Sequence, residues 1–148
     1  EVDEAPVVLD LASSLDYRRK GHIPGAHWVV RSRLREARSA VGAADRIVLT
    51  SFDGALASLA AAEVSSLWPD ARVSVLTGGT RAWIEAGGDL EVGFTSATTT
   101  ADDIWYKPYD HDDGEPERHM QEYLTWEVAL VDQLDRDPTV TFPTFPTF

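Results

Sequence analysis

Residues 46–67 constrain the fold of this chain more than any other stretch. A short apolar run, 47–50, leads into a tight loop around Gly54, and an alanine-rich segment follows with apolar side chains three and four residues apart. The run has the length of a buried strand, and the spacing predicts a helix. A strand that enters a helix through a loop is typical of α/β proteins, in which the loop N–H groups and the helix N-terminus form an electropositive cup. Ser51 lies at the mouth of this predicted cup.

Two other apolar runs predict neighbouring strands. The first run covers residues 6–11 and has Asp10 near its end, and the second run covers residues 72–76. Both are short and rich in β-branched side chains, as in buried parallel strands, so Asp10 is expected at the C-terminal end of the first strand. Helices are expected over 13–20 and 32–40, between these strands.

Two turn motifs lie on either side of the central stretch: Gly-His-Ile-Pro-Gly-Ala at 21–26 and Gly-Gly-Thr-Arg-Ala-Trp at 78–83. Their order and spacing resemble those of rhodanese (sulfurtransferase) domains over residues 5–92. The resemblance implies a three-layer α/β fold, with a central parallel sheet and helices on both faces. Ten residues carry these fold motifs: Gly21, His22, Ile23, Pro24, Gly25, Ala26, Gly78, Gly79, Ala82 and Trp83. His22 could be read as catalytic, but the resemblance favours a histidine that ties its loop down.

The loop after the central strand differs from the family pattern. Rhodanese domains carry a cysteine at the position of Ser51 and an arginine at that of Leu56, and often another arginine just after the first strand's aspartate, where this chain has Ala12. In the family the cysteine carries sulfur as a persulfide and the arginines hold the anionic donor. The loop or anion cup here consists of Ser51, Phe52, Asp53, Gly54, Ala55 and Leu56. We expect no catalytic residue and no cofactor in it.

Other chemistry is weakly supported. A serine nucleophile needs an adjacent base, and no histidine or Gly-x-Ser-x-Gly elbow surrounds Ser51. The acidic residues 110–115, with His111 and His119, could suggest a metal site. They do not follow an EF-hand pattern, and an acidic run before a helix favours capping and solvation, so no metal is expected.

Composition excludes several classes of function. The 148 residues, 43% hydrophobic, can bury one sizeable core. The net charge of −12 argues against nucleic-acid binding, and no apolar run reaches the roughly 18 residues of a membrane helix. The absence of cysteine excludes disulfides and thiolate chemistry. We also expect a cytoplasmic location.

The C-terminal third has a different composition from the rest. Residues 101–137 hold 12 acidic and 3 basic side chains, against 13 and 10 in residues 1–100. We expect a domain over 1–92, a linker with an aromatic and acidic loop over 93–115, and a helix over 116–136 that packs on the domain through an apolar stripe. Residues 137–148 read as an extended polyproline-type tail, favoured as a plain chain end over a recognition motif.

These observations predict a rhodanese-homology domain that is inactive by itself and acts structurally or as a regulator beside an active domain. The expected partners are other rhodanese domains of the same polypeptide, and the chain, which starts at Glu1, would then be a piece of it. Two alternatives stay open. One is a sulfurtransferase-related enzyme with residual anion or thiol chemistry at Ser51, and the other is a partner-binding module that uses residues 104–134.

Overall fold

A four-stranded parallel sheet lies at the centre of the N-terminal unit. The computed structural model describes residues 5–139 and 141 and divides the chain into two compact units, 1–104 and 105–148. The strands β1 (Val7–Asp10), β2 (His27–Trp28), β3 (Arg46–Thr50) and β4 (Arg72–Val75) pair in the order β2-β1-β3-β4. In register, Leu9 of β1 lies opposite His27 of β2 and Leu49 of β3.

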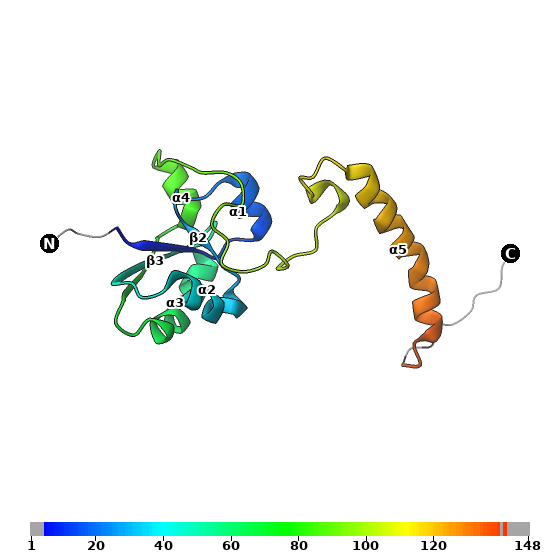
Figure 1. Ribbon diagram of the computed structural model, residues 1–148, viewed down its shortest axis with the longest axis horizontal. Coiled ribbons are helices and arrows are strands. Elements are labelled where there is room, and N and C mark those ends of the chain that lie inside the picture. Colours follow the sequence, from blue (N-terminus) through cyan, green and yellow to red (C-terminus); the bar gives the residue numbers. More distant parts are fainter. Residues whose placement is uncertain (1–4, 140, 142–148) are drawn as a thin grey trace. The chain divides into compact units, whose positions relative to one another are not determined.

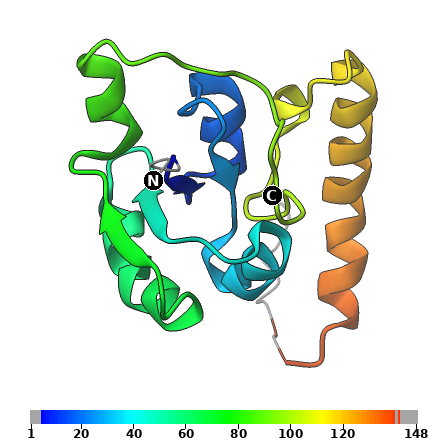
Figure 2. The ribbon, with the colours of Figure 1, turned by 60° about the vertical axis from the view of Figure 1, so that its left-hand side comes forward.

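Helices cover both faces of this sheet, as Figure 1 shows. On one face lie α2 (Leu34–Val41), preceded by the 3₁₀ turn η1 (Arg31–Arg33), and α3 (Ala55–Leu67); on the other lie α1 (Ser14–Lys20) and α4 (Gly79–Glu85). Figure 2 shows the same two pairs of helices on either side of the strands from another direction. The α/β fold predicted from the sequence is therefore confirmed.

Each face of the sheet has its own hydrophobic core. Leu9, Ile47 and Leu49 pack with residues of α2 and α3, including the fully buried Val64. The opposite core gathers around Tyr17, Ile23, Ala26 and Trp28. This division follows from the alternation of side chains along a strand, because neighbouring residues point to opposite faces.

The segment expected to be a linker belongs to the first unit. Thr98 donates its backbone N–H to the carbonyl of Trp28 at 2.9 Å, and the N–H of Trp28 donates to Ser96 at 2.9 Å. The side chain of Thr99 accepts from the N–H of Val30 at 3.2 Å. These bonds satisfy the outer edge of β2, and the compact unit extends to Ile104, beyond the expected boundary at residue 92.

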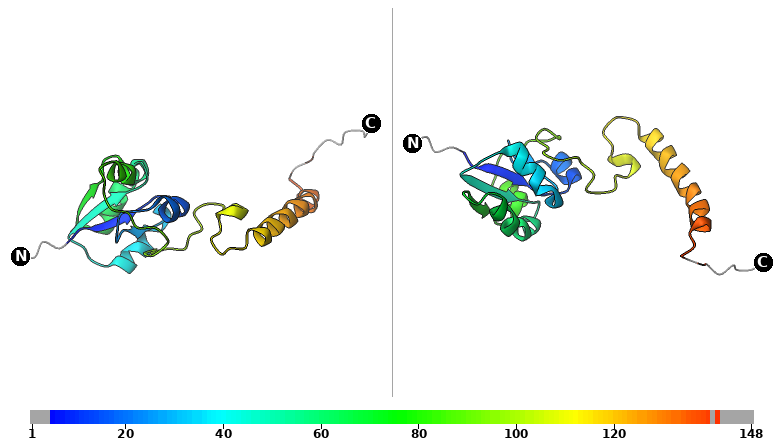
Figure 3. Two further views of the ribbon diagram at one scale, coloured as in Figure 1. Left: turned by 90° about the horizontal axis from the view of Figure 1, so that it is seen from above. Right: turned by 60° about the horizontal axis from the view of Figure 1, so that its bottom comes forward.

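The second unit is built around one long helix. The 3₁₀ turn η2 (Pro108–Asp110) precedes α5 (Pro116–Arg136), which Figure 3 shows as a single uninterrupted helix. Its bounds agree with the expected 116–136. No side chain of α5 is buried, and Val128 and Val131 of the expected apolar stripe are 77% and 62% exposed. The expected packing of this helix on the domain stays a prediction. None of the helices in the described part of the chain combines the length and hydropathy needed to cross a membrane.

Candidate functional site

The loop between β3 and α3 places Ser51 at the carboxyl end of the sheet. Gly54 has φ +81° and caps α3, a left-handed conformation that glycine adopts at little cost. The side chain of Ser51 is turned inward and is only 4% exposed. Its Oγ accepts a hydrogen bond from the N–H of Ala57 at 3.3 Å. Ser51 thus caps the first turn of α3 in the manner of an N-cap serine.

Asp53 uses a second donor of the same helix end. Its Oδ1 accepts from the N–H of Ala55 at 3.0 Å, while the N–H of Gly54 donates to the carbonyl of Ser51 at 3.2 Å. Two N–H groups of the expected anion cup, those of Gly54 and Ala55, are therefore already bonded within the loop, as is the N–H of Ala57 in the first turn of α3. A carboxylate at a helix N-terminus also occupies the position that the helix dipole offers to an anion.

The turn that joins β4 to α4, together with the first residues of α4, packs against the Ser51 loop. The N–H of Thr80 donates to the carbonyl of Ser51 at 3.0 Å, and that of Arg81 donates to Phe52 at 2.9 Å. Gly79 lies so close that a Cβ there would be 2.1 Å from the Ser51 carbonyl oxygen and 2.4 Å from the Gly54 nitrogen. The Ser51 loop (51–56) and the 78–83 motif, which are distant in the sequence, therefore form one tightly packed structure.

Asp10 lies beneath this loop at the end of β1, where the sequence placed it. Its side chain is 1% exposed, and its Oδ1 accepts from the N–H of Ala12 at 2.8 Å. Burial raises the pKa of Asp10, and this effect outweighs the stabilisation of the carboxylate by the Ala12 N–H, by His22 and by Thr80. The hydroxyls of Thr50 and Thr80 lie 3.0 Å apart in the same buried region.

Sequence reasoning missed the cation beside the loop and the two buried hydroxyls. Lys20, the last residue of α1, holds its Nζ 4.3 Å from the ring centroid of Phe52 and 2.9 Å from Asp16. Lys20 comes from a distant part of the sequence, and only the packing of α1 brings it here. Thr50 ends the central strand and Thr80 lies within the 78–83 motif, but no signal in the sequence marked either hydroxyl as part of a site.

His22 is fully buried against Tyr17 of α1. Its Nδ1 lies 3.0 Å from the carbonyl oxygen of Tyr17, and its ring stacks on that of Tyr17 with centroids 3.6 Å apart. Its backbone N–H and carbonyl both bond to Glu91 at 2.9 Å. These contacts hold the 21–26 turn between α1 and the chain that follows α4.

In the second unit, acidic side chains form ion pairs with nearby arginine and histidine side chains. Asp113 Oδ2 lies 2.7 Å from His119 Nε2 and 2.8 Å from Arg118 Nη2, and these contacts lower the pKa of Asp113, His119 most of all. Asp113 Oδ1 accepts from the N–H of Glu115 just before α5. Among residues 5–139 and 141, no cluster of three or more histidine or acidic side chains is arranged to hold a metal ion.

Comparison with known proteins agrees with this architecture. The model of the rhodanese-like domain matches residues 1–86, more than half of the chain. The chain belongs to the rhodanese-like domain family. A search of curated proteins found no significant match.

Solved structures resemble this rhodanese-like chain over different shares of its length. A thiosulfate sulfurtransferase from Pseudomonas aeruginosa is 43% identical with a TM-score of 0.77, over 89% of this chain but 25% of its own. A Rhodanese_3 like domain from Anabaena is 28% identical with a TM-score of 0.53, over 62% of this chain and 96% of its own. A possible tyrosine phosphatase from Rhodopseudomonas palustris, 24% identical over 57% of this chain and 70% of its own, has a TM-score of 0.51 and shares the fold alone. The chain thus spans a quarter of the length of the Pseudomonas protein.

Proposed function

We propose that this chain is a rhodanese-like module that does not transfer sulfur by itself and serves a structural or regulatory role within a longer sulfurtransferase-like polypeptide. Its partners are then other rhodanese domains of that polypeptide, and the proposal places it in the cytoplasm. Neither a metal nor a cofactor is part of this function.

The closed Ser51 loop is the observation that carries the proposal. Ser51 Oγ and Asp53 Oδ1 occupy the N–H groups of Ala57 and Ala55 that an anionic donor would otherwise use. The chain contains no cysteine, so no thiolate can carry sulfur. A buried hydroxyl that accepts a helix hydrogen bond, with no base beside it, is poorly suited to act as a nucleophile.

The comparison with the Pseudomonas sulfurtransferase supports the modular part of the proposal. That match covers 89% of this chain, whereas the Anabaena domain covers 62%. The larger coverage requires residues of the second unit, which the shorter match does not need. The second unit is therefore shared with a protein about four times as long, as expected of a module within a multidomain chain.

A thiosulfate:cyanide assay tests the inactive site directly. The full chain is expected to form no thiocyanate above a heat-denatured sample. Ser51→Cys alone is expected to restore little activity, because Asp53 still lies at the helix N-terminus and Leu56 supplies no cation. A triple variant, Ser51→Cys with Asp53→Ala and Leu56→Arg, should recover more than tenfold over the single change, since about 1.4 kcal/mol of anion stabilisation gives a factor of ten.

Two results would contradict the proposal. Turnover by the unmodified chain would show that Ser51 or another group performs the chemistry. Full recovery by Ser51→Cys alone would show that the loop already binds the anion. Ser58→Cys serves as the matched control, since Ser58 lies in α3 and its hydroxyl donates to the Gly54 carbonyl instead of accepting from an N–H group at the helix start, as Ser51 does.

A partner-binding role through the extension is the second candidate. Exposed apolar side chains continue along α5, among them Val128, Val131 and Leu134. A surface of this kind is unusual on an isolated domain and favours contact with another protein surface. The two candidates are compatible, because a module can dock on its neighbours through α5 while its own loop stays inactive.

A further inference from the structure

An aromatic groove runs between residues 105–109 and the first half of α5, entirely within the second unit. It encloses about 540 Å³. Its lining consists of Trp105, Lys107, Pro108, Tyr109, Met120, Tyr123 and Trp126. The rings of Trp105 and Trp126 have centroids 5.4 Å apart, and Trp105 and Tyr109 are 69% and 68% exposed. The groove therefore offers large, rigid and uncovered aromatic surfaces.

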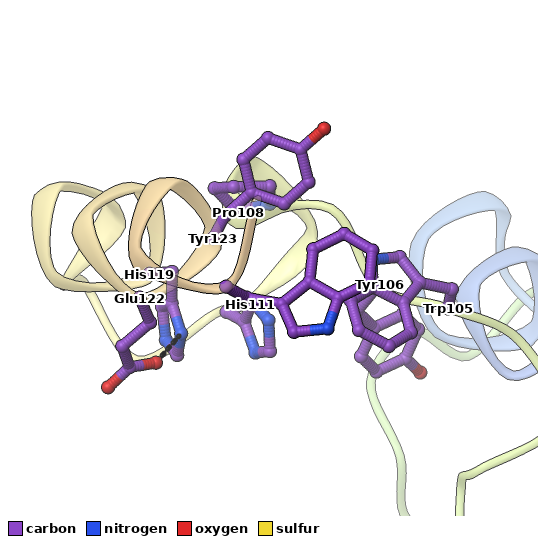
Figure 4. A pocket seen from close by; sticks show the side chains of 8 residues that line it. Trp105, Tyr106, Pro108, His111, His119, Glu122 and Tyr123 are labelled. Carbon is purple, nitrogen blue, oxygen red and sulfur yellow. Dashed lines mark ion pairs between the residues drawn. The ribbon is translucent and has the colours of Figure 1, made fainter. Parts of the chain in front are cut away.

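The polar end beside this groove is already satisfied. Figure 4 shows the adjoining hollow, where the rings of His111 and His119 stack and Glu122 turns towards His119. Glu122 also accepts from Arg118 at 2.8 Å, and His119 contacts Asp113. A charged ligand would have to displace these pairs. Apart from Lys107, the lining of the groove is aromatic and apolar, so it favours an occupant that is uncharged, aromatic and apolar.

Residues 141–148 of the chain have that chemistry. They read Thr-Phe-Pro-Thr-Phe-Pro-Thr-Phe, with no charge and a strict period of three. A polyproline II helix has three residues per turn, so in that conformation Phe142, Phe145 and Phe148 would share one edge and the prolines the next. Such segments bind in aromatic-lined grooves, because little conformational entropy is lost when they dock.

We propose that the aromatic groove binds this chain's own residues 142–148 in a polyproline II conformation. The segment after α5 is long enough to reach the groove. Trp126 lies about 15 Å from Arg136 along α5 and Met120 about 24 Å, at 1.5 Å per residue. The twelve residues after Arg136 span about 37 Å at 3.1 Å per residue, enough to turn and run back along the helix into the groove.

The returning segment would pass over side chains that need cover. Trp126, Leu130 and Leu134 follow one another at intervals of four residues and lie on one side of α5. Leu134 is 48% exposed and Trp126 43%. Because the tail is tethered, its effective concentration at the groove is about millimolar, so even a weak intrinsic affinity fills the site. This inference concerns another part of the chain and stands whether or not the Ser51 loop is active.

The indole N–H signals of the five tryptophans provide the test. In ¹H–¹⁵N spectra, ending the chain after Asp137 is expected to shift the signals of Trp105 and Trp126, each identified by its Trp→Phe variant. The indoles of Trp28, Trp68 and Trp83 donate to the carbonyls of Ala12, Gly42 and Asp89, so their signals should stay in place.

Two matched substitutions in the full chain separate the edges of the repeat. Phe145→Ser should reproduce most of the shift, whereas Thr144→Ser, on another edge, should leave the signals unchanged. A synthetic peptide of residues 139–148 added to the shortened chain should restore the signals saturably. Trp105→Ala should weaken that peptide at least about tenfold, with Trp126 as the remaining probe.

Two results would overturn the inference. If the signals of Trp105 and Trp126 are the same with and without residues 138–148, the tail does not occupy the groove. If their positions change with protein concentration over a hundredfold range, the occupant is the tail of a second copy, and binding within one chain is wrong.

Discussion

At the scale of single residues, Gly79 lies where the start of α4 packs against the Ser51 loop. It has φ +66°, and a Cβ would meet the backbone of Ser51, Asp53 and Gly54 at 2.1 to 2.8 Å. Backbone on both sides cannot move away as a flexible side chain would. The glycine is therefore required by close approach as well as by its conformation.

We expect Gly79→Ala to lower the free energy of unfolding by about 2–5 kcal/mol, the sum of a left-handed residue and overpacking. Gly87→Ala is the matched control, since Gly87 has φ +80° but nothing within 4 Å of the added Cβ. Its cost should be about 1–2 kcal/mol. Urea unfolding of both variants measures the difference. Equal losses of unfolding free energy would show that the backbone around Gly79 shifts to make room for the added Cβ.

Asp10 makes stability depend on pH in a defined direction. Burial raises its pKa in the folded state above the ordinary 3.8. The folded state then binds the proton more tightly than the unfolded state, so this contribution to stability is complete below pH 3.8 and is lost as the pH rises through the raised pKa.

Asp10→Asn removes this titration while keeping an oxygen that can accept from Ala12. Relative to the variant, the unmodified chain should lose stability between pH 4 and pH 7 in urea unfolding. A relative gain over that interval would mean that the hydrogen bonds from Ala12 and Thr80 outweigh burial.

At the scale of elements, local patterns predicted most of the fold. Three of the four strands lie where apolar runs predicted them, and α5 starts at Pro116, as expected; β2 (His27–Trp28) was not predicted. The Ser51 loop could be located because a strand, a glycine and a helix follow one another. Its internal hydrogen bonds could not, because they depend on the orientation of Ser51 and Asp53 and on the approach of Gly79 from a distant motif.

The segment 94–104 shows the limit of composition. Its serine, threonine and alanine residues predict a linker, but their backbone groups bond to Trp28, and Phe94 packs on the rings of Tyr17 and Trp28. A backbone hydrogen bond to an edge strand leaves no signature in side-chain composition. The edge of β2 requires such partners because unpaired N–H and C=O groups are costly when buried.

A chain that ends at residue 93 should therefore be much less stable than one that ends at residue 104. The shorter chain loses the cover of β2 and the Phe94 contacts, at a cost of about 1–2 kcal/mol for the partly buried aromatic side chain alone. Thermal unfolding followed by circular dichroism measures both. Phe94→Ala within residues 1–104 should account for a large part of the loss, and equal melting temperatures for the two chains would restore the linker interpretation.

At the scale of the whole molecule, the chain combines a rhodanese-like unit that has two hydrophobic clusters with an extension whose described residues contribute to neither. Both hydrophobic clusters lie within residues 7–101, whereas α5 buries no side chain. The extension is acidic, with 10 acidic and 3 basic side chains in residues 105–137. Such a helix gains most of its stability from packing against another surface.

The last prediction concerns that surface. We expect the helix 116–136 to pack on its own domain, so the full chain should melt at a higher temperature than residues 1–104, which should still unfold cooperatively because their cores are intact. Each 1 kcal/mol of packing should raise the melting temperature by about 4–8 °C for a unit of this size. Val128→Asp should remove most of the increase, because the Val128 side chain on α5 is 77% exposed and is available for this packing. Gln133→Asp serves as the control, since it adds the same charge to α5 at an exposed polar position. If residues 1–104 and the full chain melt at the same temperature, the apolar face of α5 binds another domain of the polypeptide, and the extension is a docking element for its neighbours.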